Sequence, residues 1–210
     1  MSTSPVEHAE PVAAEPRRGR PGYDQRGILE VAVGVFNEQG YDAASVAAIA
    51  QRLGLGKSAL YHHFASKEEL LRRALDEALD GLEGALRDAL AADVPAGERL
   101  QLVLTGAVTV LVERLPYVTL LLRVRGNSIV EREALDRRRA FDQELTRLVR
   151  EAQQEGTIRA DVEAGVATRL LFGMVNSIVE WYRPTGPEDA ARLSADVVAI
   201  AMGGLRVAQA

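Results

Sequence analysis

The sequence predicts an all-α protein of about nine helices, with a small N-terminal head and a larger helical body. Apolar residues recur at helical spacing along most of the chain, no segment alternates with the period of a strand, and no Asn-Gly hairpin turn occurs. Apolar residues make up 47% of the 210 residues and charged residues 26%, which is the balance of a globular protein with a substantial core.

The first element is expected to be a disordered tail at 1–21. Residues 1–16 are acidic and rich in proline and alanine, with too little apolar surface to fold and no apolar stretch of a signal peptide. RRGRPG at 17–22 then forms a cationic arm that ends at a turn. Asp24 is the expected N-cap of the first helix, which ends at Gly40.

Three more helices follow within the next fifty residues. Ser45 is the expected cap of the second helix, and Gly54 ends it. The third helix is short and runs from about 56 to 63. Ser66 begins a fourth, where Ser66 and Glu69 have the spacing of a capping box and an apolar stripe continues to Leu90. We therefore expect a small three-helix head at 22–66 and a body at 67–210.

The body is expected to remain helical to its end. One apolar stripe begins after 95–97 and is interrupted at 115–116, and a shorter segment ends at 126–127. A long helix then carries apolar residues from Ile129 to Val149. Asp161 is the expected cap of a helix that runs to Tyr182, and Pro187 is expected to begin the last helix, because proline suits the first helical position.

Charge is distributed unevenly along the chain. Its net charge is −5, yet residues 17–73 contain nine Lys or Arg against six Asp or Glu. This asymmetry suggests that only the N-terminal part meets a polyanion. There is no cysteine, which excludes disulfides and thiolate sites, and no apolar run reaches membrane-spanning length. We therefore expect a cytoplasmic protein that contacts no membrane.

The stretch LGLGKSALYHHF at 53–64 invites a catalytic or metal-binding interpretation, and the sequence argues against both. Gly54 and Gly56 follow a predicted helix, without the strand that a phosphate-binding loop requires. His62 and His63 would point about 100° apart on a helix, whereas two ligands of one metal ion need spacing of three or four residues. The only other histidine is His8 in the tail. We expect no metal site, no cofactor and no enzymatic activity.

A helix-turn-helix explains more of this stretch. A small residue at Ala50, a turn at Gly54 and an inward Leu60 are typical of two helices that pack closely, the second of which enters the DNA major groove. The outward residues available to DNA are Lys57, Ser58, Tyr61 and His62. His63 and Phe64 are expected to pack behind the helix. For Tyr61 the alternative is a core aromatic with its hydroxyl at the rim.

With these residues placed, ILEVAVGVFNEQGYDAASVAAIAQRLGLGKSALYHHFASKEELL (28–71) resembles the TetR family of bacterial transcription regulators. The resemblance implies a three-helix DNA-binding head, a ligand-binding body and a homodimer formed mainly by the last two helices. It implies repression of a palindromic operator that a small molecule relieves. Ser45 and Lys67 then match phosphate contacts. Arg17, Arg18 and Arg20 lie where some relatives insert a minor-groove arm; the alternative is a solvated tail.

The body carries a second, narrower resemblance. LPYVTLLLRVRGN (115–127) and RLLFGMVNSIVEWYRPTGP (169–187) are similar to actinobacterial regulators of phenylacetate degradation, whose inducer is phenylacetyl-CoA. The WYRPTG ending is also similar to regulators that sense other acyl-CoA or steroid-derived CoA thioesters. A lipophilic drug is the rival ligand within regulators, and an acyl-CoA-binding helical protein without a regulatory role is the rival class.

A CoA thioester needs an apolar tunnel with cations at its mouth. The expected ligand-binding residues are Leu122, Arg123, Asn127, Arg138, Phe141, Phe172, Asn176, Trp181 and Arg183, with Arg125, Arg137 and Arg139 as further cations for phosphates. An arginine run is otherwise a solvated helix face, and Asn176 has a place at the dimer seam as its alternative. The helix at 161–182 is apolar around most of its circumference, so one face should meet a partner subunit. The expected dimer interface is Val175, Val179, Leu193, Val197 and Ile200.

Overall fold

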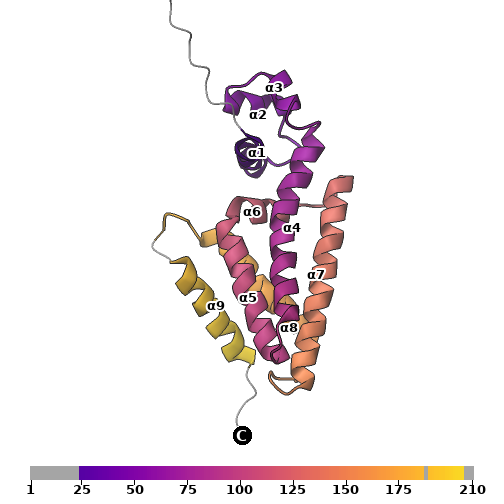
Figure 1. The fold of residues 1–210 in the computed structure, drawn as a ribbon, viewed down its shortest axis with the longest axis vertical. Helices are drawn as coiled ribbons and strands as arrows, with labels where there is room; N and C mark the ends of the chain where they lie inside the picture. The colour runs from indigo at the N-terminus through magenta and orange to yellow at the C-terminus, as the bar shows by residue number, and fades with distance from the viewer. Residues whose placement is uncertain (1–23, 187–188, 206–210) are drawn as a thin grey trace, which may run out of the picture.

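The computed structural model describes residues 24–186 and 189–205, which form nine α-helices and contain no strand (Figure 1). The predicted all-α fold is confirmed. The expected tail at 1–21, with Arg17, Arg18 and Arg20, lies outside the described residues. The helices are α1 (Gln25–Gln39), α2 (Val46–Leu53), α3 (Lys57–Tyr61), α4 (Lys67–Ala91), α5 (Ala96–Glu113), α6 (Leu115–Arg123), α7 (Ile129–Gln154), α8 (Ala164–Trp181) and α9 (Ala190–Leu205).

The head consists of α1, α2 and α3, and local sequence signals define its helix ends. The Asp24 carboxylate accepts a hydrogen bond from the Gly27 N–H at 2.8 Å, and the Ser45 hydroxyl accepts one from the Ala48 N–H at 3.1 Å. Gly54 ends α2 with φ of +66°, a conformation that suits glycine because it has no Cβ. The helices close over a core of Ile28, Phe36, Ile49 and Leu60.

Helix α4 connects the head to the body (Figure 1). The Ser66 hydroxyl caps it by accepting from the Glu69 N–H at 3.1 Å. The Glu69 carboxylate reaches back one residue further than a capping box requires, to the Ala65 N–H at 2.7 Å. Because α4 packs on α1 at one end and on α5, α6 and α7 along the rest, the expected boundary at 66/67 falls at the start of a shared helix.

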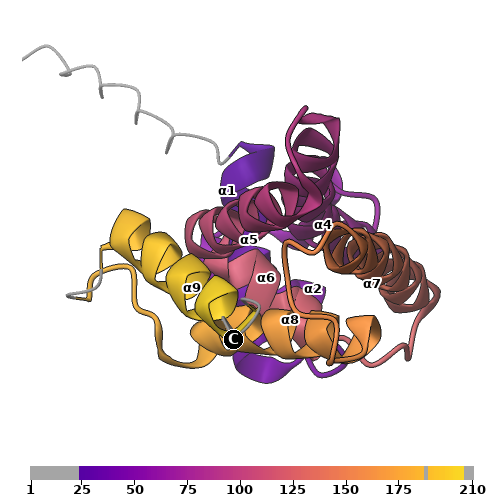
Figure 2. The same ribbon diagram turned by 90° about the horizontal axis from the view of Figure 1, so that it is seen from below.

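The body is layered around α5. Viewed from below, α9 lies beside α5, while α7 lies next to α4 and α8 runs beneath (Figure 2). Gly106 permits close approach of α4 and α5, because a Cβ at this position would lie 2.6 Å from the Ala85 Cβ. The Ser128 and Glu131 pair forms a complete capping box at the start of α7, a feature that was not predicted from the sequence.

The chain turns sharply between α5 and α6, whose axes differ by 101°. None of the described helices is by itself long and apolar enough to cross a membrane. The bent α5–α6 pair meets the length and composition criteria only when its two helices are combined.

Two predicted helix starts differ from the structure, and two residues of the expected apolar stripes are exposed. Helix α8 begins at Ala164 with Glu163 as its cap, because the Asp161 carboxylate is engaged by Arg159 at 2.5 Å. Helix α9 begins at Ala190, and Asp189 accepts from the Arg192 N–H at 2.9 Å; Pro187 lies outside the described residues. Ile129 and Leu90 are exposed at helix ends, where little packs over them.

Candidate DNA-binding surface and ligand cavity

The outer face of α3 gathers the residues predicted to read DNA. Lys57, Ser58 and Tyr61 are exposed, while Leu60 is buried beneath them. Tyr61 is 50% exposed, so it is a surface side chain and not the core aromatic considered as its alternative. His62 is also exposed, at the position that ends α3. This surface presents cationic and hydroxyl donors on one short helix.

The prediction that His63 packs behind the helix is wrong. Helix α3 ends at Tyr61, two residues earlier than expected, so His63 lies in a turn where its side chain is exposed. Its N–H donates to the Leu60 carbonyl at 3.0 Å. Phe64 is buried, as predicted.

Lys67 has a different environment from the exposed phosphate contact that was expected. Its ammonium donates to the carbonyls of Tyr41 and Ala44 at 2.9 and 3.0 Å, and lies 4.2 Å from the centroid of the Tyr41 ring. Burial, followed by the charges of Glu68, Glu131 and Asp42, raises the pKa of Tyr41 to about 12. Lys67 therefore fastens the α1–α2 turn to the start of α4. Ser45 remains exposed at the start of α2.

Five of the predicted ligand-binding residues converge on one cavity between α4, α6, α7 and α8. Its volume is only about 40 Å³, which is room for little more than one water molecule. Phe141 and Phe172 meet edge to face with ring centroids 5.2 Å apart. The lining residues are Leu79, Leu82, Glu83, Val118, Leu121, Leu122, Arg138, Phe141, Asp142, Phe172 and Asn176.

The polar groups of this cavity come mainly from α4 and α7. Arg138 donates to the Leu121 carbonyl at 3.4 Å. Burial raises the pKa of Asp142, and the charge of Arg138 opposes this shift. Although the Asp142 side chain retains considerable solvent contact, its carboxylate is close enough to the apolar lining for burial to dominate. Leu79, Leu82 and Glu83 were missed as lining residues, because the α4 stripe is indistinguishable from ordinary core in the sequence.

Four other predicted ligand-binding residues lie away from the cavity. Arg123 donates to the Asn37 carbonyl at 2.8 Å and Asn127 donates to the Asp42 carboxylate at 3.0 Å, so both connect the body to the head. Trp181 is exposed at the end of α8, and Arg183 bonds to the carbonyls of Glu180 and Tyr182. Arg123, Asn127 and Arg183 thus bond to backbone groups or to head residues, and none of the four lines this cavity, contrary to the prediction.

Arg137 is likewise not free to meet a phosphate. Its guanidinium donates to Asp76 at 2.8 Å, to Asp80 at 2.5 Å and to both oxygens of Glu83 at 2.8 and 2.7 Å, and these bonds raise its pKa. Burial raises the pKa of Asp76 even though Arg137 counteracts it. Arg139 pairs with Asp136 within its own helix. The Arg137 cluster holds α4 against α7.

Arg137→Met is expected to lower the free energy of unfolding by about 2 kcal/mol at pH 7, because three carboxylates lose their common cation. Without Arg137 the folded-state pKa of Asp76 rises further above its unfolded value. An acid of this kind disfavours folding as pH rises through its folded pKa, so the deficit should shrink toward pH 4. Urea unfolding of wild type and Arg137→Met at pH 4.5 and 7.5 measures this loss of stability. Equal losses at both pH values would contradict the role of Arg137 as the cation of these carboxylates.

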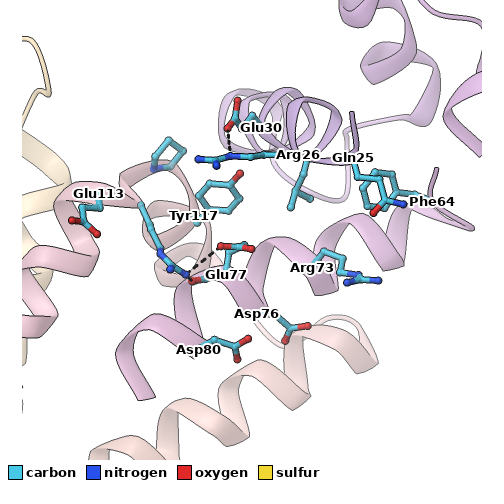
Figure 3. Close-up of a pocket in the computed structure, with 13 residues that line it drawn as sticks. Gln25, Arg26, Glu30, Phe64, Arg73, Asp76, Glu77, Asp80, Glu113 and Tyr117 are labelled. Carbon is cyan, nitrogen blue, oxygen red and sulfur yellow. Dashed lines mark hydrogen bonds and ion pairs between the residues drawn. The ribbon is translucent and has the colours of Figure 1, made fainter. Parts of the chain in front are cut away.

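A groove of about 890 Å³ lies between the head and the body (Figure 3). Its charged lining combines three arginines with five carboxylates, and Arg26–Glu30 and Arg114–Glu77 are already paired. This excess of acid is a poor match for the phosphates of a nucleotide. The lining residues are Gln25, Arg26, Leu29, Glu30, Phe64, Arg73, Asp76, Glu77, Asp80, Glu113, Arg114, Pro116 and Tyr117.

The expected dimer interface needs correction. Val175, Leu193 and Val197 are buried within the single chain, because α9 turns these residues toward the body and α8 points Val175 inward. Val179 is half-buried, and Ile200 alone of the five is strongly exposed, at 67%. Leu170 is exposed to the same extent and was missed. The apolar surface open to a partner consists of Val166, Leu170 and Trp181 on α8 and Ile200 on α9.

Within residues 24–186 and 189–205, no three or more His, Cys, Asp or Glu side chains are arranged to hold a metal ion.

Two family models match the chain. The model described as bacterial regulatory proteins, tetR family, matches residues 28–74, which include the head. The model described as tetracyclin repressor-like, C-terminal domain, matches residues 93–205. Together they match most of the helical part of the chain.

Similar proteins include regulators with solved structures. The transcriptional repressor KstR2 of Mycobacterium tuberculosis H37Rv is 30% identical over 186 residues, covering 85% of this chain and 90% of that protein. SCO3833 of Streptomyces coelicolor A3, a TetR regulator, is 49% identical with a TM-score of 0.78, over 86% of this chain and 91% of that one. AibR, solved with isovaleryl coenzyme A and operator DNA, is 26% identical with a TM-score of 0.71, over 84% and 96%.

Proposed function

The chain belongs to the TetR family of bacterial transcription regulators, and from this premise we propose that it is a repressor released from its operator by an acyl-CoA thioester. The family consists of DNA-binding regulators and not of enzymes. The observation that carries the ligand class is the apolar cavity, where Phe141, Phe172, Arg138 and Asn176 meet. Its aromatic lining suits an acyl group, and Arg138 and Asn176 supply polar partners for the thioester end.

The DNA half of the proposal follows from α3. Two heads that lie roughly 34 Å apart, about one helical turn of DNA, would read a palindromic operator in successive major grooves. Such spacing requires a homodimer, for which Leu170, Trp181 and Ile200 provide exposed apolar surface. The proposed place of action is the cytoplasm. Lys57, Ser58, Tyr61 and His62 are the proposed contacts to DNA, with Ser45 at the start of α2 and the arginines at 17–20 as additional ones.

Three observations support a CoA thioester as the effector. AibR, a structural neighbour, was solved with isovaleryl coenzyme A. KstR2, another neighbour, is described as a ketosteroid transcriptional regulator, and the proposed effector resembles a ketosteroid in being bulky and apolar at one end. The resemblance of 115–127 and 169–187 to phenylacetate regulators favours phenylacetyl-CoA in particular. No cofactor other than this effector is proposed.

The test begins with an operator selected by the protein itself from a pool of random DNA duplexes, which is expected to yield a palindromic site. Gel shift then measures the affinity for this site in phenylacetyl-CoA, isovaleryl-CoA, free CoA and phenylacetate. Release by an acyl-CoA but not by free CoA or the free acid is the expected result. By linkage, that acyl-CoA must bind less tightly to the DNA-bound form. Failure to select any duplex would overturn the regulator itself.

The residues that line the cavity also favour a second candidate ligand. Asp142 gives the cavity a carboxylate beside two phenylalanines, a combination suited to a lipophilic cation, whereas the second carboxylate of the lining, Glu83, is bound by Arg137. The same gel shift distinguishes the two classes. Release by a cationic dye, with no effect of any CoA thioester, would establish a drug-responsive repressor instead.

Phe172→Ala is expected to shift effector preference toward larger acyl groups. Removing the ring opens space in a cavity of about 40 Å³ and eliminates the edge-to-face contact with Phe141. Calorimetric titration with isovaleryl-CoA and with longer-chain acyl-CoAs should show the ratio of their affinities moving in favour of the longer chains by about tenfold. Leu102→Ala, exposed on α5, is the control; an unchanged ratio in Phe172→Ala would remove Phe172 from the site.

A further inference from the structure

We propose that Asn37 is the positioning residue through which the ligand cavity acts on the DNA-binding head. This inference rests on the proposed function, because it concerns how occupation of the cavity alters operator affinity. It assigns a role to a residue of α1 that touches neither the cavity nor the recognition surface of α3.

Asn37 bonds to both ends of α6. Its side-chain amide donates to the carbonyl of Pro116, the second residue of α6, at 2.8 Å. Its own backbone carbonyl accepts from the guanidinium of Arg123, the last residue of α6, also at 2.8 Å. That carbonyl is among the four at the end of α1 that have no partner within the helix, and a cation there also complements the helix dipole. One residue therefore fixes the head to the whole length of α6.

The opposite side of α6 forms a wall of the cavity. Val118, Leu121 and Leu122 contribute the lining from this helix. Because the cavity holds only about 40 Å³, any acyl group larger than a water molecule must move a wall. Displacement of α6 would then change the contacts of Asn37, because both hydrogen bonds between Asn37 and this helix must lengthen or break.

Helix α6 is the wall best placed to yield. It has nine residues and lies between a sharp bend and a loop, whereas α4 and α7 have 25 and 26 residues and are clamped together by Arg137. Well-packed neighbours resist displacement. The start of α6, at Pro116 and Tyr117, also borders the open groove between head and body, labelled through Tyr117 in Figure 3. Open space therefore exists next to the start of α6, on the side that faces the head.

The Asn37 amide is itself incompletely bonded. Its Oδ1 atom is buried and accepts no hydrogen bond from any described residue, while its Nδ2 is bound to Pro116. A buried acceptor without a partner destabilises the arrangement that buries it. The joint therefore lacks one of the hydrogen bonds that would hold the Asn37 side chain in this position.

The test replaces the unidentified ligand by a side chain. Val118→Phe places a ring on α6 in a cavity too small to hold it, and so pushes α6 from the same side as an acyl group. In the otherwise unchanged protein, operator affinity is expected to fall about tenfold, within the usual range of coupling between sites. With Asn37→Ala or Asn37→Leu also present, Val118→Phe should weaken operator binding less than about threefold.

Asn37→Leu keeps the bulk of the side chain and removes only its donor and acceptor, which separates the hydrogen bond from packing. Gln39→Ala is the matched control, because Gln39 is exposed two residues further along α1 and makes no side-chain bond to the described part of the chain. The tenfold effect of Val118→Phe must persist in that background. Gel filtration and circular dichroism establish that each variant is folded and retains its oligomeric state.

The outcomes are distinct. Equal weakening by Val118→Phe in the Asn37 and Asn37→Leu backgrounds would overturn the role of Asn37 while leaving the proposed function intact. Failure of the unchanged protein to bind any selected duplex would instead overturn the proposed function. Should Val118→Phe not fold, Leu122→Phe replaces it, because Leu122 is only half-buried on the same wall and the same comparison applies.

Discussion

Tyr61→Ala should reduce operator affinity about 100-fold, because two heads each lose a contact that contributes roughly 1–3 kcal/mol. Tyr61 is half exposed on α3 and supports no core packing, so the free energy of unfolding should stay within about 0.5 kcal/mol of wild type. Fluorescence anisotropy with a selected operator measures the first quantity and thermal unfolding the second.

The Tyr61→Ala protein must remain a dimer, because loss of the dimer would also lower operator affinity. Sedimentation at the concentration of the anisotropy experiment provides this control, together with the exposed body variant Leu102→Ala. A Tyr61→Ala protein that binds the operator normally would place the recognition surface elsewhere. One that unfolds would place Tyr61 in the core of the head.

Lys57→Ala and Lys67→Ala should separate two roles that look alike in the sequence. Lys67→Ala is expected to lower the free energy of unfolding by about 2–3 kcal/mol, because two carbonyls lose a cationic donor and Tyr41 loses its cation–π partner. Lys57 is exposed at the start of α3 and makes no bond to another described residue. Its replacement should leave stability unchanged.

Salt dependence distinguishes the two lysines on DNA. Lys57→Ala should make the slope of log affinity against log salt shallower by about 1 for each head, because one phosphate contact is lost. Lys67→Ala should change operator affinity only as far as the head unfolds, with the slope retained. A shallower slope in Lys67→Ala at full stability would restore Lys67 as a phosphate contact.

The features that the sequence predicted well are those whose physics is local. Asp24, Ser45 and Ser66 cap helices because their partners are N–H groups three residues away, and Gly54 turns the chain because of its own backbone freedom. Helix spacing also located Phe141, Phe172 and Asn176 on inward faces, so that part of the cavity followed from periodicity and the family resemblance.

The features that escaped prediction depend on distant partners. Asn127 bonds to Asp42, 85 residues away, and Arg123 to Asn37, 86 residues away, and nothing in an arginine or asparagine at the end of a helix reveals such a partner. Leu193 and Val197 of α9 were predicted to lie at the dimer interface, because amphipathicity alone does not tell whether they pack on their own α5 or on another subunit. His63 was misplaced because helix ends are uncertain by a residue or two.

The small volume of the cavity would raise the effector concentration at which the proposed regulator responds. When only a small fraction of molecules has the cavity open, the apparent affinity for an effector falls by that fraction, whatever the quality of its contacts. The edge-to-face packing of Phe141 on Phe172 would therefore help to set the effector concentration that is needed for release from the operator. Substitutions that loosen this pair would make the promoter respond to scarcer effector without a single new contact to it, so that the same pair affects sensitivity as well as the acyl preference expected for Phe172→Ala.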